Sequence, residues 1–422
     1  MRLKHVATIS KGRATAGLAN NDQLGTPLIN MAALRSTSCA DWVEGVKVDC
    51  EPGEIVVCWD GSNSGEFFRS QHSGALASTI GLIKASNRID KLFLFYLLKS
   101  QEAHLRENIV GMGIPHVNPT ELKNIKVPQI DLATQRQIAD FLDSETARID
   151  LLIEKKQRLV ALLGEREEAT FIDHVTGKGL LHEKKRSGVE WIKEIPQHWS
   201  APKFTQVARQ ETGHTPSRKV EDYWVPEECV IPWMSLADVW QLRDGANIYV
   251  SNTSEKISEI GMANSAARLL PKDTVILSRT ASVGFPAIMK EPMATTQDFA
   301  AWICGKQIRP LFLYYVLRAM KPEFRRLMMG STHQTIYMPD IRSFRTPLPP
   351  LGEQDQIIAR LSSTIQAFRK SATALKKSTD RLKEYRSALI TAAVTGQIDV
   401  QTYAKSGTPD RRLEAIQEEV GA

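Results

Sequence analysis

Apolar residues recur at alternating spacings of three and four in two stretches of the chain, residues 131–178 and 351–396. A period of 3.5 residues sustained over several heptads predicts two long helices that pack as a coiled coil. Prolines precede each stretch, and each ends at a glycine after Val-Thr (Gly177 and Gly396), as a helix C-cap would. About 40 residues at roughly 1.5 Å per residue give a rod near 60 Å long. The expected contact positions are Leu142, Ile149, Leu152, Leu159 and Leu163 in the first stretch, which Lys156 interrupts, and Leu361, Ile365, Phe368, Leu375 and Leu382 in the second.

The two stretches are copies of each other. Residues 128–177 align with residues 347–396 at an offset of 219 without a gap, so that Gln135 falls on Gln354 and Leu142 on Leu361. A match of this length, kept in register across two predicted helices, indicates duplicated architecture.

The repeat extends upstream of the helices. Residues 92–98 and 311–317 are apolar on nearly all sides and predict short buried helices, while 55–59 and 274–278 are β-branched runs that predict strands. Nearer the start the offset falls from 219 to 201, so the second copy carries about 18 additional residues before Pro271. A period this long indicates a duplicated domain rather than a solenoid.

The pattern predicts a mixed α/β (α+β) protein with two tandem globular domains, each followed by a long helix, and with the two helices paired antiparallel. We divide the chain into a first globular domain (1–130), a central long helix (131–178), a linker leading into the second repeat (179–200), a second globular domain (201–350), a C-terminal long helix (351–396) and a tail (397–422).

The charges of the two predicted helices differ in sign. Residues 132–178 carry seven Lys or Arg and nine Asp or Glu, for a net charge of −2, whereas residues 351–394 carry eight and four, for +4. Opposite charges favour pairing of the two helices within one chain, although pairing with the helices of another subunit stays open. An antiparallel pair would fix the distance between whatever the two domains bind.

Composition and net charge limit the cellular compartments and the classes of partner that fit the protein. The 422 residues carry a net charge of +6, which suits a polyanionic partner but is weak evidence by itself. Five dispersed cysteines form no C-x-x-C pair, and the sequence shows no signal peptide and no apolar run near 18 residues. We therefore expect a cytoplasmic protein with free thiols and no membrane partner.

No motif for catalysis is found. The sequence has no phosphate-binding G-x-x-x-x-G-K-[ST] loop, G-x-S-x-G elbow, H-E-x-x-H pair or EF-hand loop, and Asn118-Pro119-Thr120 departs from the Asn-Pro-Pro-aromatic signature of amino-methyltransferases. Nine scattered histidines have no spacing typical of metal ligands. A hydrolase that uses Cys58 or His72 is disfavoured, because the second copy has no equivalent of either. A duplicated chain without duplicated catalytic groups is interpreted as a binding protein.

Polar loops occupy equivalent points of the two copies. Hydroxyls, cations and amides are the groups that contact phosphates and base edges in the major groove, although any solvated loop supplies them. The candidate contact residues are Lys11, Arg13, Thr15, Ser62, Asn63 and His116 in the first copy and Thr215, Ser217, Arg218, Lys219, Arg279, Thr280, Ser282, His333, Gln334 and Thr335 in the second.

Four motifs of the chain are typical of one protein family. They are residues 188–199 (GVEWIKEIPQHW), Gly213-x-Thr215-Pro216, the proline-rich residues 347–357 and residues 385–396. Together they resemble the specificity (S) subunit of type I restriction-modification systems, along nearly the whole chain. The first two are similar to the family's opening motif for a recognition domain and to the start of that domain, and the last two to the start and the end of its long helix. The first copy lacks the opening motif, has Gln129-Ile130-Asp131 in place of the prolines, and has Thr134 where the second copy has Glu353.

The resemblance implies a non-catalytic reader of double-stranded DNA. Each globular domain, as a target-recognition domain, would read one half of a bipartite asymmetric target, and the coiled coil would set the spacer. Two modification (M) subunits would dock on the helices, and restriction (R) subunits would join them. S-adenosylmethionine, ATP and Mg would be used by these partners, with no cofactor or metal bound by this chain. The alternative is a two-headed coiled-coil scaffold that does not bind DNA.

Overall fold

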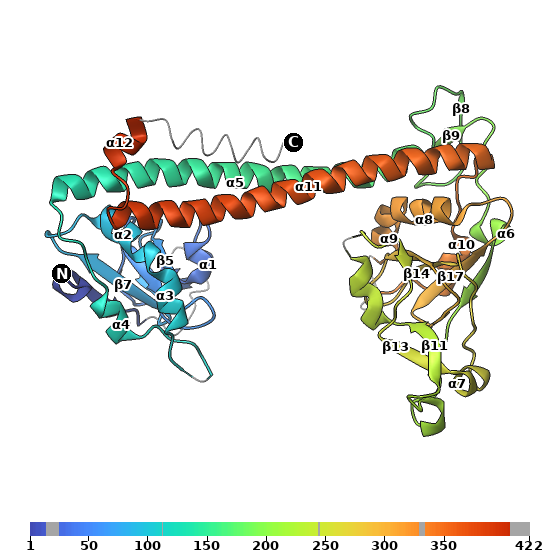
Figure 1. The fold of residues 1–422 in the computed structure, drawn as a ribbon, viewed down its shortest axis with the longest axis horizontal. Coiled ribbons are helices and arrows are strands. Elements are labelled where there is room, and N and C mark those ends of the chain that lie inside the picture. The colour runs from blue at the N-terminus through green and yellow to red at the C-terminus, as the bar shows by residue number, and fades with distance from the viewer. Residues whose placement is uncertain (14–24, 112, 244, 329–333, 406–422) are drawn as a thin grey trace. The chain divides into compact units, whose positions relative to one another are not determined.

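The computed structural model describes residues 1–13, 25–111, 113–243, 245–328 and 334–405 (Figure 1). The chain forms two compact units: unit 1 comprises Met1–Arg158 and Ala374–Ala422, and unit 2 comprises Leu159–Thr373. Each unit therefore contains a globular domain and part of both long helices, whereas the division drawn from sequence assigned each helix whole.

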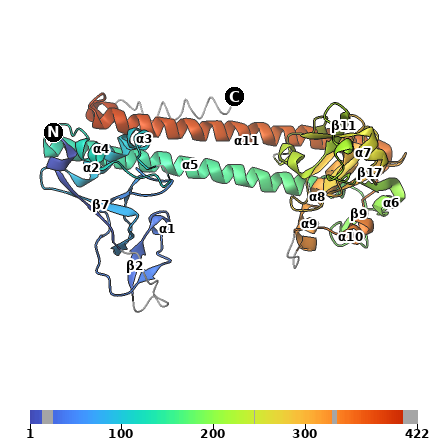
Figure 2. The ribbon, with the colours of Figure 1, turned by 90° about the horizontal axis from the view of Figure 1, so that it is seen from below.

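Unit 1 is built on an antiparallel four-stranded sheet with the strand order β1-β7-β4-β5. These strands are β1 (Ala7–Lys11), β7 (Ile80–Ala85), β4 (Ile55–Cys58) and β5 (Phe67–Arg69). A smaller sheet, β3-β2-β6, lies on the side of the main sheet away from the long helices (Figure 2). Its strands are β3 (Trp42–Val43), β2 (Thr26–Ile29) and β6 (Ala75–Leu76), and the short helices are η1 (Leu3–His5), α1 (Met31–Leu34), α2 (Lys91–Ser100), α3 (Glu102–Glu107) and α4 (Pro119–Asn124).

Unit 2 repeats this plan with additions. Its main sheet has the order β10-β17-β14-β15-β12 and its small sheet the order β13-β11-β16. The strands are β10 (Ala208–Thr212), β11 (Cys229–Met234), β12 (Tyr249–Val250), β13 (Glu255–Ser258), β14 (Val275–Ser278), β15 (Pro286–Met289), β16 (Ala294–Thr295) and β17 (Phe299–Cys304), with the hairpin β8 (Lys184–Arg186) and β9 (Glu194–Pro196) before them. The short helices are α6 (Phe204–Val207), η2 (Glu221–Tyr223), η3 (Leu236–Leu242), α7 (Glu259–Ala263), α8 (Pro310–Ala319), α9 (Lys321–Met328) and α10 (Met338–Ser343).

The sheets and the two long helices confirm the predicted mixed α/β fold. The runs expected to form strands are β4 and β14, and the apolar runs at 92–98 and 311–317 lie in α2 and α8. The fifth strand of the unit 2 sheet, β12, lies within the segment where the second copy has its additional residues and pairs parallel with β15.

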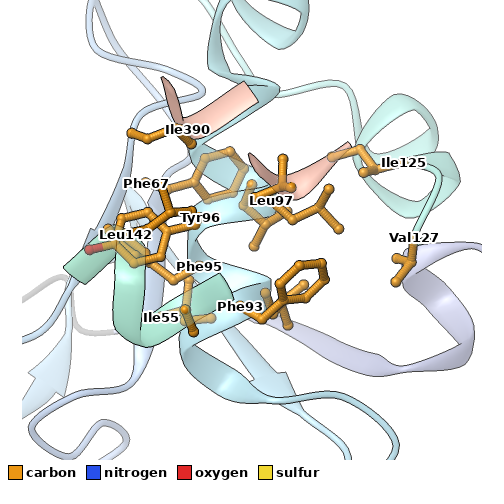
Figure 3. Close-up of a cluster of buried hydrophobic side chains, with 14 of the residues drawn as sticks. Ile55, Phe67, Phe93, Phe95, Tyr96, Leu97, Ile125, Val127, Leu142 and Ile390 are labelled. Carbon is orange, nitrogen blue, oxygen red and sulfur yellow. The ribbon is translucent and has the colours of Figure 1, made fainter. Parts of the chain in front are cut away.

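Helix α2 is apolar all round because it is covered on both sides. Phe93, Leu94 and Leu98 are fully buried in the core of unit 1. Figure 3 shows Phe93, Phe95, Tyr96 and Leu97 of α2 gathered with Ile55 and Phe67 of the sheet and with Leu142 and Ile390 of the long helices. Burial of such side chains contributes about 1.5–3 kcal/mol each, so the packing of this helix helps to hold the domain on the long helices. Helix α8 occupies the same place in unit 2.

The long helices α5 (Leu132–Val175) and α11 (Leu351–Val394) span 44 residues each. Asp131 caps α5 by accepting hydrogen bonds from the backbone N–H groups of Ala133 and Thr134, whereas Pro349 and Pro350 precede α11. Both helices end in a glycine with positive φ, Gly177 at 69° and Gly396 at 73°. The hydrogen bonds from Lys178 N to Asp173 O and from Gln397 N to Ala392 O complete Schellman caps. The predicted glycine C-caps are thus confirmed.

The glutamine shared by the two copies ties each domain to its own long helix. Gln135 Oε1 accepts a hydrogen bond from Asp90 N, and its Nε2 donates to Ile130 O. Gln354 Oε1 accepts from Arg309 N, and its Nε2 donates to the carbonyls of Gln307 and Pro349. Asp90 and Arg309 are the N-cap residues of α2 and α8, so the same buried amide fixes the start of both helices in each unit.

A tyrosine makes a second link between each domain and its long helix. It lies about one and a half turns after the N-cap of α2 and of α8. Tyr96 of α2 donates to Asp143 at 2.9 Å and lies 3.0 Å from the Thr146 hydroxyl, both on α5. Tyr315 of α8 lies 2.8 Å from the Ser362 hydroxyl on α11. The phenol group is therefore satisfied at equivalent positions although its partners differ.

In each unit the end of one long helix also packs against the beginning of the other. Unit 1 contains Ile149 of α5 and Leu382 of α11 in one core, and Asp150 pairs with Arg386 at 2.8 Å. Unit 2 contains Phe171 of α5 and Leu361 of α11 in one core, and Glu167 pairs with Arg369 at 3.3 Å. The beginning of α5 thus lies with the end of α11 in unit 1, and the reverse holds in unit 2.

The expected contact position Leu159 is wrong. Its side chain is 49% exposed, whereas Lys156 is 8% exposed. The more buried positions of α5 alternate at spacings of three and four, at Thr146, Ile149, Ile153, Lys156, Val160 and Leu163, so Leu159 lies beside this stripe rather than in it. Leu142, Ile149, Leu361, Ile365 and Leu382 are buried, and Leu152, Leu163, Phe368 and Leu375 are half-buried.

The two copies use the position of Glu353 differently. In unit 2, Glu353 accepts hydrogen bonds from His198 at 2.8 Å and from the Trp199 indole at 2.9 Å, so it joins the segment 188–199 to the start of α11. In unit 1, Thr134 at the position of Glu353 donates to the cap residue Asp131 at 2.6 Å. Across the described residues, no helix has the length and apolar character needed to cross a membrane.

Candidate nucleic-acid interface

In unit 2 four polar segments converge next to the end of β14. Thr280 and Thr335 form an isolated bridge, and Ala281 N donates to Gln334 O at 2.8 Å. Thr215 donates to the Gln297 side chain at 2.9 Å. The structure thus brings together Thr215, Arg279, Thr280, Ser282, Gln334 and Thr335 from loops that lie up to 120 residues apart in sequence.

Arg279 is held at the centre of this cluster. Its Nε donates to Gln297 O at 2.9 Å and its Nη1 to Ile336 O at 3.4 Å, while its backbone N–H donates to Asp298 O at 2.8 Å. Asp298 in turn accepts from the hydroxyls of Thr280 and Thr296. The guanidinium group therefore fixes the loops and still has donor groups for an external acceptor.

In unit 1 the equivalent cluster is organised by Asp60, which occupies the position of Arg279 in the repeat. Asp60 pairs with Lys11 and with His116, both at 2.6 Å. Gly61 N donates to Pro115 O at 2.9 Å, and Asp60 and His116 form an isolated bridge. Lys11 lies at the end of β1 rather than in the predicted loop.

Burial raises the pKa of Asp60, but hydrogen bonds from Lys11 and His116 outweigh it, so the pKa lies below its ordinary value. The carboxylate is 14% exposed, whereas the side chains of Lys11 and His116 are each 44% exposed. The acid thus stays inside and holds two donor groups at the surface, an arrangement suited to phosphate oxygens or base edges.

A glycine follows the first strand of the main sheet in each unit and allows a close approach to a backbone carbonyl. It is Gly12 after β1 and Gly213 after β10. A Cβ at Gly12 would lie 2.3 Å from Ala77 O, and one at Gly213 would lie 1.8 Å from Thr295 O. Both distances are far below van der Waals contact. This explains why the two copies, which differ in nearly every loop residue, share this glycine.

Ser217 and Arg218 belong to a different cluster from Thr215. Arg218 stacks 3.7 Å from the centre of the Trp224 ring and pairs with Glu255 of β13, and Trp224 Nε1 donates to Ser217 O at 3.0 Å. Trp233 of β11 lies 5.6 Å from Trp224. These contacts fix the loop on the small sheet.

The remaining candidates are surface residues or lie outside the described ranges. Arg13, Ser62 and Lys219 are exposed, and the Asn63 amide oxygen accepts a hydrogen bond from Arg35 at 3.0 Å. Thr15 and His333 lie outside the described residues.

Several residues of the clusters were missed in the sequence. Glu66 pairs with Arg35 at 3.1 Å and with Arg106 at 3.0 Å, which places two further cations beside the 61–65 loop. Gln297 and Asp298 follow β16 and hold the unit 2 cluster. The offset of 219 could have singled out the exchange of Asp60 for Arg279, but Arg35 and Arg106 reach the loop through the fold and carry no local signal. Among the described residues no group of three or more His, Cys, Asp or Glu is placed to hold a metal.

Comparisons with known proteins give a consistent result. The family model described as "Type I restriction modification DNA specificity domain" matches residues 1–161 and 196–377. The specificity subunit of the type I restriction enzyme MjaVIII of Methanocaldococcus jannaschii is 26% identical over 404 residues, covering 93% of this chain and 90% of that protein.

Solved structures share the fold. A chain from a type I restriction-modification system superposes with a TM-score of 0.66 at 17% identity, covering 93% of this chain and 96% of that one. The HsdS subunit from Thermoanaerobacter tengcongensis superposes with a TM-score of 0.52 at 17% identity, covering 94% and 96%.

Proposed function

The chain belongs to the type I restriction modification DNA specificity family, and we propose that it is the subunit that selects the DNA sequence for such a complex. The observation that carries this proposal is the loop cluster at the same place in both units, with different side chains in each. A duplicated site without duplicated catalytic groups suits binding rather than catalysis. The comparisons do not support a scaffold that does not bind DNA.

Each unit would read one half of a bipartite target. Lys11 and His116 present donors in unit 1, and Arg279, Thr280 and Gln334 present donors and acceptors in unit 2. Arginine reads guanine and glutamine reads adenine by paired hydrogen bonds in the major groove. Since the two clusters differ in charge and geometry, the two half-sites would differ, and the target would be asymmetric.

The two long helices would form one antiparallel coiled coil that sets the spacer between the half-sites. The ion pairs of Asp150 with Arg386 in unit 1 and Glu167 with Arg369 in unit 2 support this pairing. Helices of 44 residues at 1.5 Å per residue are about 66 Å long.

Catalysis would come from partners. Two modification subunits would dock on the long helices and methylate adenine with S-adenosylmethionine, and restriction subunits with ATP and Mg would join that core. The present chain would contribute sequence recognition and no cofactor of its own.

A salt series tests DNA binding. The purified complex of this chain with its modification subunits is bound to duplex DNA between about 50 and 200 mM salt, a range over which phosphate contacts weaken affinity steeply. We expect log affinity to fall linearly with log salt. A flat response, or no binding at any salt concentration, would contradict the proposal.

A further inference from the structure

The apolar contacts at the beginnings of the long helices do not decide which helix pairs with which. Ile138 and Leu142 of α5 correspond to Ile357 and Leu361 of α11, and all four are buried. At these positions the α5 helices of two chains could bury the same residues against each other, whereas Lys156 stands where α11 has Leu375. Discrimination against that pairing has to come from residues that differ between the copies.

Two ion pairs supply this difference. Asp150 of α5 pairs with Arg386 of α11 at 2.8 Å in unit 1. Glu167 of α5 pairs with Arg369 of α11 at 3.3 Å in unit 2. Asp150 and Arg369 occupy the same position of the two copies, as do Glu167 and Arg386. The two ion pairs are therefore one repeated contact in which the copies have exchanged the sign of the charge.

Because of this exchange of charge, two copies of α5 repel each other at these positions, and so do two copies of α11. Helix α5 has an acid at both positions, so an α5–α5 pair would place Asp150 against Glu167 twice. Helix α11 has an arginine at both, so an α11–α11 pair would place Arg369 against Arg386 twice. Like charges opposed at a helix contact disfavour that partner, and opposite charges favour it. Pairing of α5 with α11 is the combination that gives two attractions.

Residues of the globular domains match the exchange of charge between the two helices. Arg318 of α8 also contacts Glu167, at 3.6 Å. The equivalent residue of α2 is Lys99, which would face an arginine at the position of Glu167; it pairs instead with Glu102 of α3 at 2.6 Å. The sign of the charge at position 167 or 386 is thus matched by the residues around it.

We propose that Asp150, Glu167, Arg369 and Arg386 determine that the long helices pair within one chain and reject those of a second copy. This proposal rests on the helix pairing proposed above. It also sets a rule for joining halves of related chains: a half with acids at both positions requires a half with cations at both.

The test compares two full-length double variants that carry the same kinds of substitution. In D150R/R369D both contacts within a chain become repulsive, because an arginine faces Arg386 in unit 1 and an aspartate faces Glu167 in unit 2, while α5–α5 and α11–α11 pairs become attractive. In the control D150R/R386D both contacts within a chain stay attractive, because the pair in unit 1 is reversed and that of Glu167 with Arg369 is unchanged. Its α5–α5 and α11–α11 pairs also become attractive, so the control removes the rejection of a second copy without opposing the pairing within a chain. Molar mass is measured by light scattering across a concentration series, together with the melting temperature.

We expect D150R/R369D to melt several degrees below the wild type and to shift toward a dimer as concentration rises. D150R/R386D should keep the melting temperature of the wild type and shift toward a dimer less than D150R/R369D does, because its attractions within a chain remain. Equal losses in both variants, or no change in either, would overturn the proposal. A third variant, Leu382→Asp, tests the helix pairing itself by placing a charge in the shared core of unit 1. If it melts as the wild type does, the pairing fails; if it is destabilised while the two charge variants behave alike, the pairing stands and the charge rule fails.

Discussion

The two globular domains can be compared at two places, where they meet the long helices and at the loop clusters. At the helices, Gln135 and Gln354 make corresponding hydrogen bonds to an N-cap backbone N–H and to a carbonyl that precedes the long helix. At the loops, Asp60 holds Lys11 and His116 in unit 1, whereas Arg279 stands at the same position in unit 2 and binds carbonyl oxygens. The attachment to the long helices is constant, whereas the loop clusters differ between the two domains. This is the division expected of two readers that must be held alike and must read different sequences.

The largest expected effect comes from breaking the constant part. Gln354→Leu removes the partners of Arg309 N and of the Gln307 and Pro349 carbonyls in a buried site, and we expect a loss of roughly 2–4 kcal/mol in the free energy of unfolding. Urea denaturation measures it. Gln135→Leu should cost a similar amount, and the exposed neighbour variant Gln356→Leu should cost little. A strong effect in one copy and none in the other would contradict the shared attachment.

The variable part is tested by Arg279→Ala. The change removes contacts to Gln297 O and Ile336 O as well as a candidate base contact, so we expect recognition of one half-site to be relaxed by about 1–3 kcal/mol. Methylation by the assembled complex is measured on targets altered in one half-site at a time. The other half-site is the internal control, and relaxation of both halves together would mean that the units do not read separately.

A smaller effect is expected from Glu353, which joins segment 188–199 to α11. Burial raises the pKa of Glu353, but hydrogen bonds from His198 and Trp199 outweigh it, so the pKa lies below its ordinary value near 4.5. A carboxyl with a lowered pKa stabilises the fold above its ordinary pKa, and this contribution is lost as pH falls through the lowered one. Glu353→Gln should cost about 1 kcal/mol at neutral pH, and the difference from wild type should vanish in acid.

This pH dependence is followed by thermal unfolding between pH 7 and pH 3. An equal difference between the two proteins at every pH would show that the charge of Glu353 does not contribute.

The smallest effect is expected from Thr134→Glu, which gives the first copy the residue of the second. Since the hydrogen bond of Thr134 to the cap residue Asp131 is exposed to solvent, we expect a change within about 0.5 kcal/mol, measured by urea denaturation. A stabilisation as large as the loss in Glu353→Gln would indicate that the carboxylate acts through the helix start rather than through the two side chains.

The sequence predicts the frame better than the loops, for a physical reason. Apolar spacing and the offset of 219 locate α5, α11, α2, α8 and both glycine C-caps, because helix periodicity and φ preference are local properties. The repeat also singles out Gln135 and Gln354 but not their bonds to Asp90 and Arg309, which depend on how α2 and α8 dock. Leu159 was misplaced because the more buried stripe passes through Lys156 and Val160 and leaves the leucine between them on its flank. Asp60 could not be found as a partner of Lys11 and His116, since the fold alone brings the three segments together.

The most direct test of the central claim is a map of methylated adenines in genomic DNA from cells that carry this chain with its modification subunits. We predict a single target of two different half-sites separated by a spacer of fixed length, and in Arg279→Ala a target with one half relaxed and the other unchanged. A continuous or palindromic target, or one altered in both halves by this single substitution, would contradict the account.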